Sequence, residues 1–501
     1  MKKLIAAAAL CSALPLFAKI TTGAPFSDGA VLQRGMDVPV WGRALPSNGG
    51  KKPDSLKVEF AGQEKIAKVA ADGAWKVSLS PMEASKESRT MKLSALAGGT
   101  VLETREIKDV LVGEVWFASG QSNMECPIWG PRTRYRDGKG GMMTVMTRLP
   151  YVRYVKNPRK WAVQPADLSA KWRRFTPEEL APGAEKDKVP SQLSAVAFYY
   201  ARELYLALDV PVGIIDSSWG GTNIDAWTPR CGYDGCDKSI KPVAAYPVKA
   251  KWNKKKDRKW CITYEMQQPT VLFNGMVAAY APMAMRGFIW YQGCHNAQEP
   301  HLYRAKLHAL YEGWRREFAN PALKFYLVQL APFKSNWLEL CMAQTQFAEE
   351  EKNAAIAVTA DVGNFSDIHP NDKEVVAKRL AFHALKRDYG FAIPEDDSPV
   401  LKSASFKDGR ANLAFSHVKN WYVYAPDCSR AAAFELAGAD GVWHPAAICN
   451  YVNKDYIHGD TIILSSAAVP SPVKARYMGK PLVSGTLYNE ASLPLGPFET
   501  K

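Results

Sequence analysis

The sequence predicts an α/β protein in which a parallel-sheet domain lies between a small β-sandwich and a second β-rich domain. Residues 19–108 contain short alternating strands separated by turn residues, which is typical of a β-sandwich. From residue 109 buried strands alternate with helices, as in a parallel sheet covered by helices. A linker rich in Pro and Asp precedes a return to β texture. We therefore expect domains at 19–108, 109–395 and 396–501, after a leader at 1–18.

The leader has the pattern of a secretory signal peptide. Lys2 and Lys3 precede a short apolar run, and cleavage is expected near Ala18. The run is too short to span a bilayer comfortably, and no later stretch is apolar enough to do so. The sequence thus predicts an exported protein, periplasmic or extracellular, without a membrane anchor.

The overall charge is basic, with a formal net charge of +14 at pH 7. In an exported protein this favours acidic partners such as sialylated glycans, although the same charge could serve solubility alone. No nucleic-acid-binding module is recognisable, so no nucleic-acid partner is expected. The basic run at residues 249–259 is expected to be a solvated segment near the rim of the site, with substrate attraction as the alternative.

The expected mature chain keeps an even number of cysteines, which permits disulfides in an exported protein. Cys231 and Cys236 are the best local pair, because two glycines allow the intervening loop to close. Neither a paired C-x-x-C nor an H-x-x-x-H pattern is present, so no metal or other cofactor is expected. The cysteines are Cys126, Cys231, Cys236, Cys261, Cys294, Cys341, Cys428 and Cys449.

The strands and helices follow from hydrophobic periodicity. In the first β region the alternating strands lie at residues 38–42, 56–60 and 75–79. In the α/β region strands are expected at 110–117, 210–216, 286–291, 324–330 and 355–362, and helices at 191–208, 303–318 and 373–388.

Ser122 lies where the strand 110–117 gives way to a polar run that can start a helix. A serine at such a corner points out of the sheet edge, close to the unbonded N–H groups of the first helical turn. An acyl-transfer nucleophile would be placed there. The alternative is that Ser122 is only the N-cap of the helix.

Three further loops follow strands of the same predicted sheet. They carry Gly220 with Gly221, residues 292–296, and residues 361–370. Ligands bind at the carboxyl ends of strands in open α/β sheets, so these loops and Ser122 are expected to meet. In the last loop His369 can take the proton of a serine, and Asp367, two residues away, can hold the other ring nitrogen.

Hydrogen-bond donors for a tetrahedral oxyanion are expected from the same loops. The backbone N–H groups of Ser122 and of Gly220 or Gly221 are the main candidates. The side chains of Gln292, Asn296 or Asn223 could add an amide donor.

Several blocks of the chain resemble the sialate O-acetylesterases, which belong to the SGNH hydrolases. The blocks are residues 120–124 (GQSNM), 219–222 (WGGT), 290–293 (WYQG) with Asn296, and 367–370 (DIHP). Residues 31–34, 40–42, 272–276 and 487–498 also fit, so the resemblance covers nearly the whole mature chain.

The resemblance implies an SGNH-type three-layer α/β/α hydrolase domain and assigns roles to residues. Ser122 would be the nucleophile, His369 the base and Asp367 its partner. The oxyanion hole would use Ser122, Gly220, Gly221, Gln292 and Asn296. Substrate contacts are expected from Gln121, Asn123, Trp219 and Asn223.

One position departs from the family pattern, since Gln292-Gly293 is followed by Cys294 where the family usually has Glu. We expect an active but divergent esterase, because Asp367 can still orient His369. A disulfide between Cys294 and Cys126 is an alternative use of this residue.

The expected reaction is removal of O-acetyl groups from sialic acids through an acetyl-serine intermediate. An acetylxylan or hemicellulose esterase is the alternative within the same enzyme class. A non-catalytic glycan-binding protein on the same scaffold is the alternative from another class.

Overall fold

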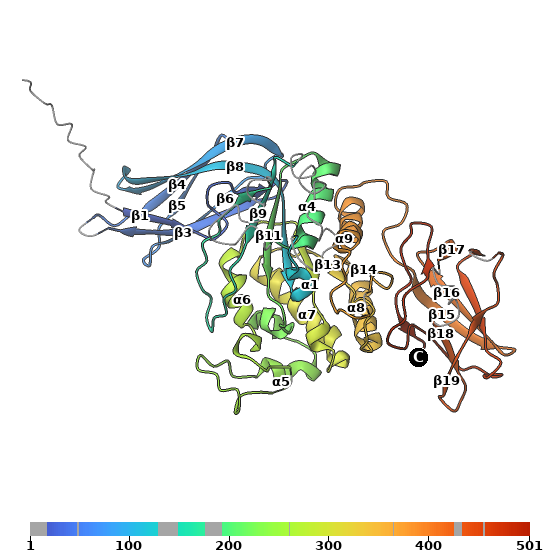
Figure 1. The fold of residues 1–501 in the computed structure, drawn as a ribbon. Helices are drawn as coiled ribbons and strands as arrows, with labels where there is room; N and C mark the ends of the chain where they lie inside the picture. Colours follow the sequence, from blue (N-terminus) through green and yellow to red (C-terminus); the bar gives the residue numbers. More distant parts are fainter. Residues whose placement is uncertain are drawn as a thin grey trace, which may run out of the picture.

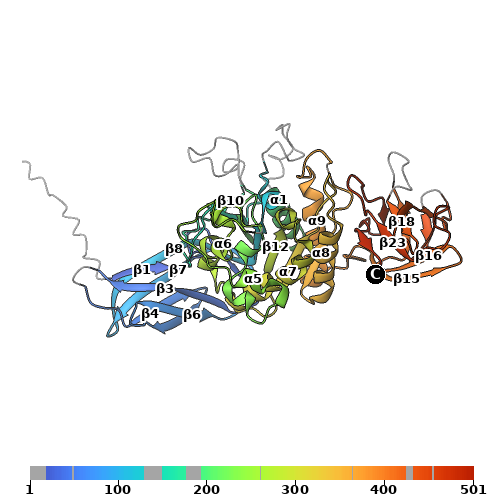
Figure 2. The same ribbon diagram turned by 90° about the horizontal axis from the view of Figure 1, so that it is seen from below.

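A computed structural model describes residues 18–47, 50–128, 149–175, 193–259, 261–363, 365–424, 433–453 and 456–501. An N-terminal β region, a central α/β region and a C-terminal β region lie in a row (Figures 1 and 2). Residues 1–17, with most of the expected signal peptide, and Cys428 lie outside the described residues.

The central sheet confirms the predicted parallel arrangement. Its strands follow the order β10–β9–β11–β8–β12–β13–β14, and every neighbouring pair from β9 to β14 is parallel. Most residues of the parallel strands are buried, which explains their continuous apolar runs. The bounds are β8 Thr100–Gly120, β9 Val152–Lys156, β10 Arg173–Arg174, β11 Val212–Ser218, β12 Gly287–Tyr291, β13 Lys324–Val328 and β14 Ala354–Ala357.

Helices cover both faces of this sheet. Trp116 and Phe117 are neighbours on β8, so their side chains lie on opposite faces. The Trp116 ring packs 5.2 Å from Tyr200 of α4, and the Phe117 ring 5.4 Å from Trp314 of α7. Helix α9 lies beside α4, and α8 beside α7 (Figure 1). Their bounds are α4 Ala195–Leu208, α7 Pro300–Glu317, α8 Leu338–Glu350 and α9 Lys373–Arg387.

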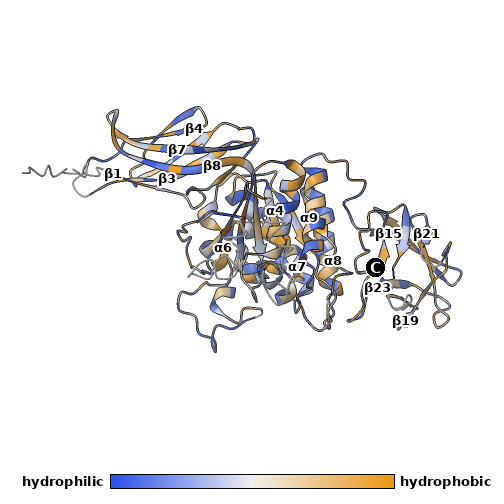
Figure 3. Cartoon of the chain, turned by 45° about the horizontal axis from the view of Figure 1, so that its top comes forward, coloured by the Kyte–Doolittle hydropathy of each residue, from blue (hydrophilic) through white to orange (hydrophobic). Residues whose placement is uncertain are grey.

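The long helices carry hydrophobic and hydrophilic residues on different sides (Figure 3), as their sequence periodicity indicates. Shorter helices lie in the connections: α1 Ser122–Glu125, η2 Asp225–Trp227, η3 Arg230–Tyr233, η4 Lys238–Ile240, α5 Lys241–Ala244, η5 Glu265–Gln267, α6 Val271–Met276, η6 Ala278–Tyr280 and η7 Cys294–Asn296. None of the described helices is both long enough and apolar enough to cross a membrane.

The N-terminal β region is continuous with the central sheet through β8. The first part of β8 pairs antiparallel with β7, and its last residues form the middle of the parallel sheet. The expected boundary at 108/109 therefore falls within one strand. The other strands are β1 Ala18–Thr22, β2 Val31–Gln33, β3 Val38–Pro46, β4 Ser55–Phe60, β5 Gln63–Lys68, β6 Ala74–Leu79 and β7 Ser85–Ala97.

Buried Glu114 fastens the two regions together. Arg34, which follows β2, donates from Nε to Glu114 Oε1 at 2.6 Å, and Arg286 also pairs with this carboxylate. Gln33 donates to Glu114 Oε2 at 2.9 Å and accepts from Val115 N–H. Burial alone would raise the pKa of Glu114, but the two guanidinium groups hold it below its usual value.

The C-terminal β region supports the loop that leads to His369. Gly485 N–H donates to Ala360 O at 2.7 Å, and Ser484 also bonds that carbonyl oxygen. Its strands are β15 Val400–Lys407, β16 Arg410–Ser416, β17 Asn420–Val423, β18 Phe434–Ala437, β19 Trp443–Pro445, β20 Ala447–Ile448, β21 Tyr456–His458, β22 Thr461–Ser465, β23 Lys474–Tyr477, β24 Leu487–Tyr488 and β25 Phe498–Glu499.

The candidate disulfide between Cys231 and Cys236 is not formed. No cysteine of the described residues is part of a disulfide. Cys231 Sγ instead lies 3.3 Å from Glu317 Oε1 of α7, because η3 turns this side chain toward the helix. The basic run at 249–259 forms turns, in which Lys249 pairs with Asp257.

Candidate active site

The turn after β8 places Ser122 at the carboxyl edge of the sheet. Gly120 has φ +141°, and a Cβ there would lie 2.3 Å from Tyr291 O of the neighbouring strand. Only glycine lets the two strands approach this closely before the turn. Ser122 is partly exposed and is the first residue of α1. The N-cap position belongs to Gln121, so the alternative that Ser122 is merely the cap is wrong.

Gly220 packs directly against Ser122. A Cβ built on Gly220 would lie 3.2 Å from the Cβ of Ser122. The Gly220 N–H donates to Glu125 Oε2 at 2.8 Å, which differs from its expected role as an oxyanion donor. Gly221 follows with φ +71°, and its carbonyl accepts from Gln267. The loop of Gly220 and Gly221 therefore reaches Ser122, with one of its two glycine N–H groups already used by a carboxylate.

His369 and Asp367 form the expected pair. His369 Nδ1 lies 2.8 Å from Asp367 Oδ1, and the His369 backbone N–H donates to the same oxygen at 3.0 Å. In the neutral ring this contact puts the proton on Nδ1 and the lone pair on Nε2. His369 is buried, whereas the Asp367 side chain is 35% exposed. The pair has the geometry of a base held in one tautomer by a carboxylate.

Asn123 joins the turn that carries Ser122 to the loop that carries His369. Its Nδ2 donates to Ile368 O at 3.1 Å, and its Oδ1 accepts from Lys373 Nζ at 2.6 Å. Asn123 is only 2% exposed, so it differs from the expected substrate contact. Lys373, in the first turn of α9, is also buried and lies 5.5 Å over the Tyr291 ring. The sequence carried no signal for Lys373, since a lysine at a helix start is ordinary.

Gln121 and Gln292 hold the loops together from inside. Gln121 Oε1 accepts from Gln292 Nε2 at 3.2 Å and from the N–H groups of Gly293 and His295. Gln292 is fully buried, and its Nε2 also donates to Thr222 O and Asn296 Oδ1. Both amides were expected at the substrate or oxyanion. The structure uses them instead to fix the loop at residues 292–296 against the turn that carries Ser122.

Asn296 and Asn223 are likewise occupied within the protein. Asn296 Oδ1 accepts from Ile224 N–H, and its Nδ2 donates to Glu299 Oε1 at 2.8 Å. Asn223 Nδ2 donates to Gln267 O at 2.9 Å. Both residues are fully buried, which corrects the expectation that they face the substrate. Buried amides need such partners, because an unpaired one costs about 1–3 kcal/mol.

Trp219 is the expected substrate residue that stays partly exposed. The backbone N–H of Trp219 donates to Gly120 O at 3.1 Å, which fixes Trp219 beside the turn that carries Ser122. The guanidinium of Arg159 lies 5.9 Å from the centre of the Trp219 ring. Arg159 also donates from Nε to Glu125 Oε1 at 2.7 Å. Arg159 was missed by sequence reasoning.

Cys294 begins η7, and neither it nor Cys126 is part of a disulfide, so the disulfide alternative is wrong in this structure. Burial raises the pKa of Cys294 to about 12. The thiol is therefore neutral near pH 7 and is a poor nucleophile.

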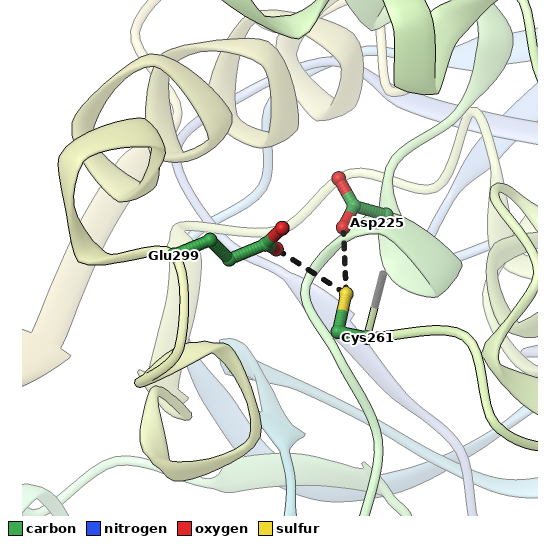
Figure 4. A group of neighbouring side chains, drawn as sticks. All are labelled: Asp225, Cys261 and Glu299. Carbon is green, nitrogen blue, oxygen red and sulfur yellow. Dashed lines mark hydrogen bonds between the residues drawn. The ribbon is translucent and has the colours of Figure 1, made fainter. Parts of the chain in front are cut away.

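A second polar cluster lies behind the third loop (Figure 4). Cys261 Sγ lies 3.2 Å from Glu299 Oε1 and 3.8 Å from Asp225 Oδ2, and these ligand atoms are close enough to hold a metal. Lys306 Nζ, however, donates to Asp225 Oδ2 at 2.8 Å and to Glu299. Its ammonium group already supplies the cation that these carboxylates need.

Comparison with known proteins agrees with this arrangement. Residues 112–383 match the family model described as carbohydrate esterase, sialic acid-specific acetylesterase. The chain belongs to this family. The matched residues run from the last part of β8 to α9 and include all four loops at the sheet edge.

Individual relatives extend the likeness over most of the chain. A human protein named sialate O-acetylesterase is 29% identical over 92% of this chain and 88% of its own length. The mouse protein of the same name is 28% identical over 71% of this chain and 72% of its own length. A carbohydrate acetylesterase from Xanthomonas citri superposes with a TM-score of 0.77 at 31% identity, covering 96% of this chain and all of that one. The chain is therefore a carboxylic ester hydrolase that acts on acetylated sugars.

Proposed function

We propose that the protein is an exported serine esterase that removes O-acetyl groups from sialic acids. The observation that carries the proposal is the junction of two loops. Asn123, next to Ser122, donates to Ile368 O, next to His369, while Asp367 holds the imidazole at 2.8 Å. These contacts between the neighbouring residues support a serine at a helix start that works with an oriented histidine, as acyl transfer requires. Relatives named sialate O-acetylesterase support the choice of sugar.

In the first step Ser122 Oγ attacks the acetyl carbonyl while His369 Nε2 accepts its proton. Asp367 stabilises the imidazolium that forms. The tetrahedral intermediate collapses, the bond to the sugar oxygen breaks, and His369 returns the proton to the leaving hydroxyl. Water then attacks the acetyl-serine with His369 again as base, and acetate leaves. Neither a metal nor an organic cofactor enters these steps.

The oxyanion is assigned to backbone N–H groups. Ser122 is at the first position of α1, where N–H groups have no partner within the helix. Gly221, one residue beyond the glycine that touches Ser122, is the second candidate. Gly220 N–H would join only if Glu125 released it. Each such donor contributes roughly 3 kcal/mol to transition-state stabilisation.

The architecture and location complete the proposal. Helices on both faces of a parallel sheet, with the serine after its central strand β8, support an SGNH-type hydrolase domain. We keep 109–395 as its extent, with β8 shared with the sandwich at 19–108, and 396–501 as the C-terminal β domain. The Lys2–Lys3 pair and the following apolar run support export after cleavage near Ala18.

The decisive experiment compares acetate release from O-acetylated N-acetylneuraminic acid and from acetylated xylan. The proposal expects faster release from the sialic acid, and a pre-steady-state burst of 4-nitrophenol from 4-nitrophenyl acetate equal to the enzyme concentration. Faster release from xylan would make the protein a hemicellulose esterase. Glycan binding without any acetate release would indicate the non-catalytic alternative.

A further inference from the structure

Arg159 lies at the same edge of the sheet as Ser122. It follows β9, and β9, β11 and β8 are parallel neighbours in the sheet. All three strands therefore end at the same edge, where the turn that carries Ser122 follows β8. Its Nε bonds Glu125 Oε1, and Glu125 Oε2 accepts from Gly220, the residue packed on Ser122. One carboxylate therefore links Arg159 to the glycine that touches the nucleophile.

The backbone around Arg159 is fixed on both sides. Asn157 N–H donates to Asp216 O at 2.9 Å, and its Nδ2 donates to Met276 O at 3.1 Å. Ala162 N–H donates to Val271 O at 2.9 Å. A cation that recognises a ligand gains from such preorganisation, because less entropy is lost on binding.

The side chain keeps a free recognition edge. The Arg159 side chain is 57% exposed even though Nε is bonded to Glu125 and the guanidinium lies over Trp219. Among the residues that the structure describes, its two terminal nitrogens have no hydrogen-bond acceptor. Two parallel N–H groups on a planar guanidinium match the two oxygens of a carboxylate.

Two other lysines of the described residues near this edge are already committed. The Lys156 side chain is 7% exposed and donates to Asp216 and Ser218. Lys373 is buried against Asn123. Glu125, the acid bonded to Arg159, has its charge compensated by Arg159 and by the Gly220 N–H.

We propose that Arg159 is a specificity residue that binds the carboxylate of an acidic O-acetylated sugar while its acetyl group lies at Ser122. The inference rests on the proposed function and deepens it, since it names the group that distinguishes a sialic acid from a neutral acetylated sugar. Trp219, held under the guanidinium, offers its partly exposed ring to the same ligand.

The test uses one sugar in two forms, O-acetylated N-acetylneuraminic acid and its C1 carboxamide, which lacks the negative charge. The wild type is expected to prefer the acid by about 10–100-fold in kcat/KM, the range for hydrogen bonds to a charged group. Arg159→Gln is expected to remove most of this preference, mainly through KM for the acid. Arg159→Lys, which keeps the charge but not the planar edge, should retain part of it.

Arg304→Gln is the matched control, because Arg304 is also about half exposed and pairs with a glutamate, Glu350 of α8. It is expected to keep the wild-type preference. Equal loss on acid and carboxamide in Arg159→Gln would overturn the inference, since a merely structural role lowers both. If the wild type hydrolyses the acid and the carboxamide equally well, the proposed role of Arg159 is wrong, but the proposed esterase function is not affected. If the enzyme hydrolyses 4-nitrophenyl acetate but releases acetate from neither sugar, both the proposed action on sialic acids and the role of Arg159 are wrong.

Discussion

Two polar clusters near the carboxyl edge of the sheet contain similar donor atoms but differ in how their charge is balanced. At the first, Asp367 is one-third exposed and supports a single imidazole. At the second, Asp225 and Glu299 are buried around Lys306, and Cys261 completes the group (Figure 4). In the first cluster the carboxylate sets the tautomer of an imidazole. In the second, one buried ammonium group is shared by two carboxylates.

Side chains that could bind a metal do not make a functional site merely because they lie close together. Burial raises the pKa of Asp225, whereas Glu299, which burial alone would also shift upward, is kept below its usual pKa by Lys306. Glu299 also accepts a hydrogen bond from Asn296 Nδ2. Asn296 Oδ1 in turn accepts from Gln292 Nε2 and from the backbone N–H of Ile224. The second cluster is therefore a support for the loops that carry the chemistry.

The largest effect on activity is expected from loss of Ser122, the proposed nucleophile that the first cluster serves. Ser122→Ala should lower kcat by about 10⁴–10⁶-fold, because no group replaces the attacking oxygen. Acetate release and thermal unfolding are measured together, with Ser335→Ala, an exposed loop serine, as control. Activity of Ser122→Ala within tenfold of the wild type would remove Ser122 from the mechanism.

The partner of the base should matter next. Asp367→Asn removes the charge that orients His369 and stabilises its imidazolium, so kcat should fall by about 10²–10⁴-fold. The partial exposure of Asp367 favours the lower part of this range. The check is kcat against pH for 4-nitrophenyl acetate. An unchanged kcat would mean that another group orients His369.

Lys306→Met tests the buried cluster, and its expected effect is on stability. Two carboxylates would be left without their cation, so the free energy of unfolding should fall by about 3–5 kcal/mol at pH 7. The pKa of Glu299 is lowered in the folded state, so its pairing stabilises above the unfolded carboxylate pKa and is lost as pH falls. The difference between variant and wild type should therefore shrink below about pH 4.

Urea unfolding at several pH values measures this difference. Lys378→Met is the matched control, because Lys378 pairs with Glu374 on the surface of α9 and should cost less than about 1 kcal/mol. Equal costs for the two lysines would show that the buried cluster gains nothing from its ammonium group.

The smallest expected effect is that of metal. Lys306 repels a second cation at Asp225, Cys261 and Glu299, so EDTA or added Zn²⁺ should shift the melting temperature by less than about 1 °C. Differential scanning fluorimetry checks this. A larger, saturable rise with Zn²⁺ would show that a metal displaces Lys306.

Much of the fold could be predicted from the chain, because hydrophobic periodicity is local. The strands β11 to β14 and the helices α4, α7 and α9 lie within five residues of their expected bounds, whereas β9, β10 and α8 were not predicted. The expected boundary at 108/109 did not anticipate β8, since one strand can pair antiparallel with β7 and parallel with β11 at its two ends. Periodicity identifies a strand but not its partners.

The sequence by itself determined that Ser122, Asp367 and His369 follow strands of the sheet, and it carried the family blocks around them. Only the tertiary structure decided which polar side chains are left for a ligand. Gln292, Asn296 and Asn223 look like donors in the sequence, yet burial obliges their amides to bond within the protein. Arg159 shows nothing in sequence and becomes notable through its neighbours Glu125 and Trp219. The physical reason is that residue type sets what a group can bond, whereas burial and distant neighbours set which of those bonds are already made.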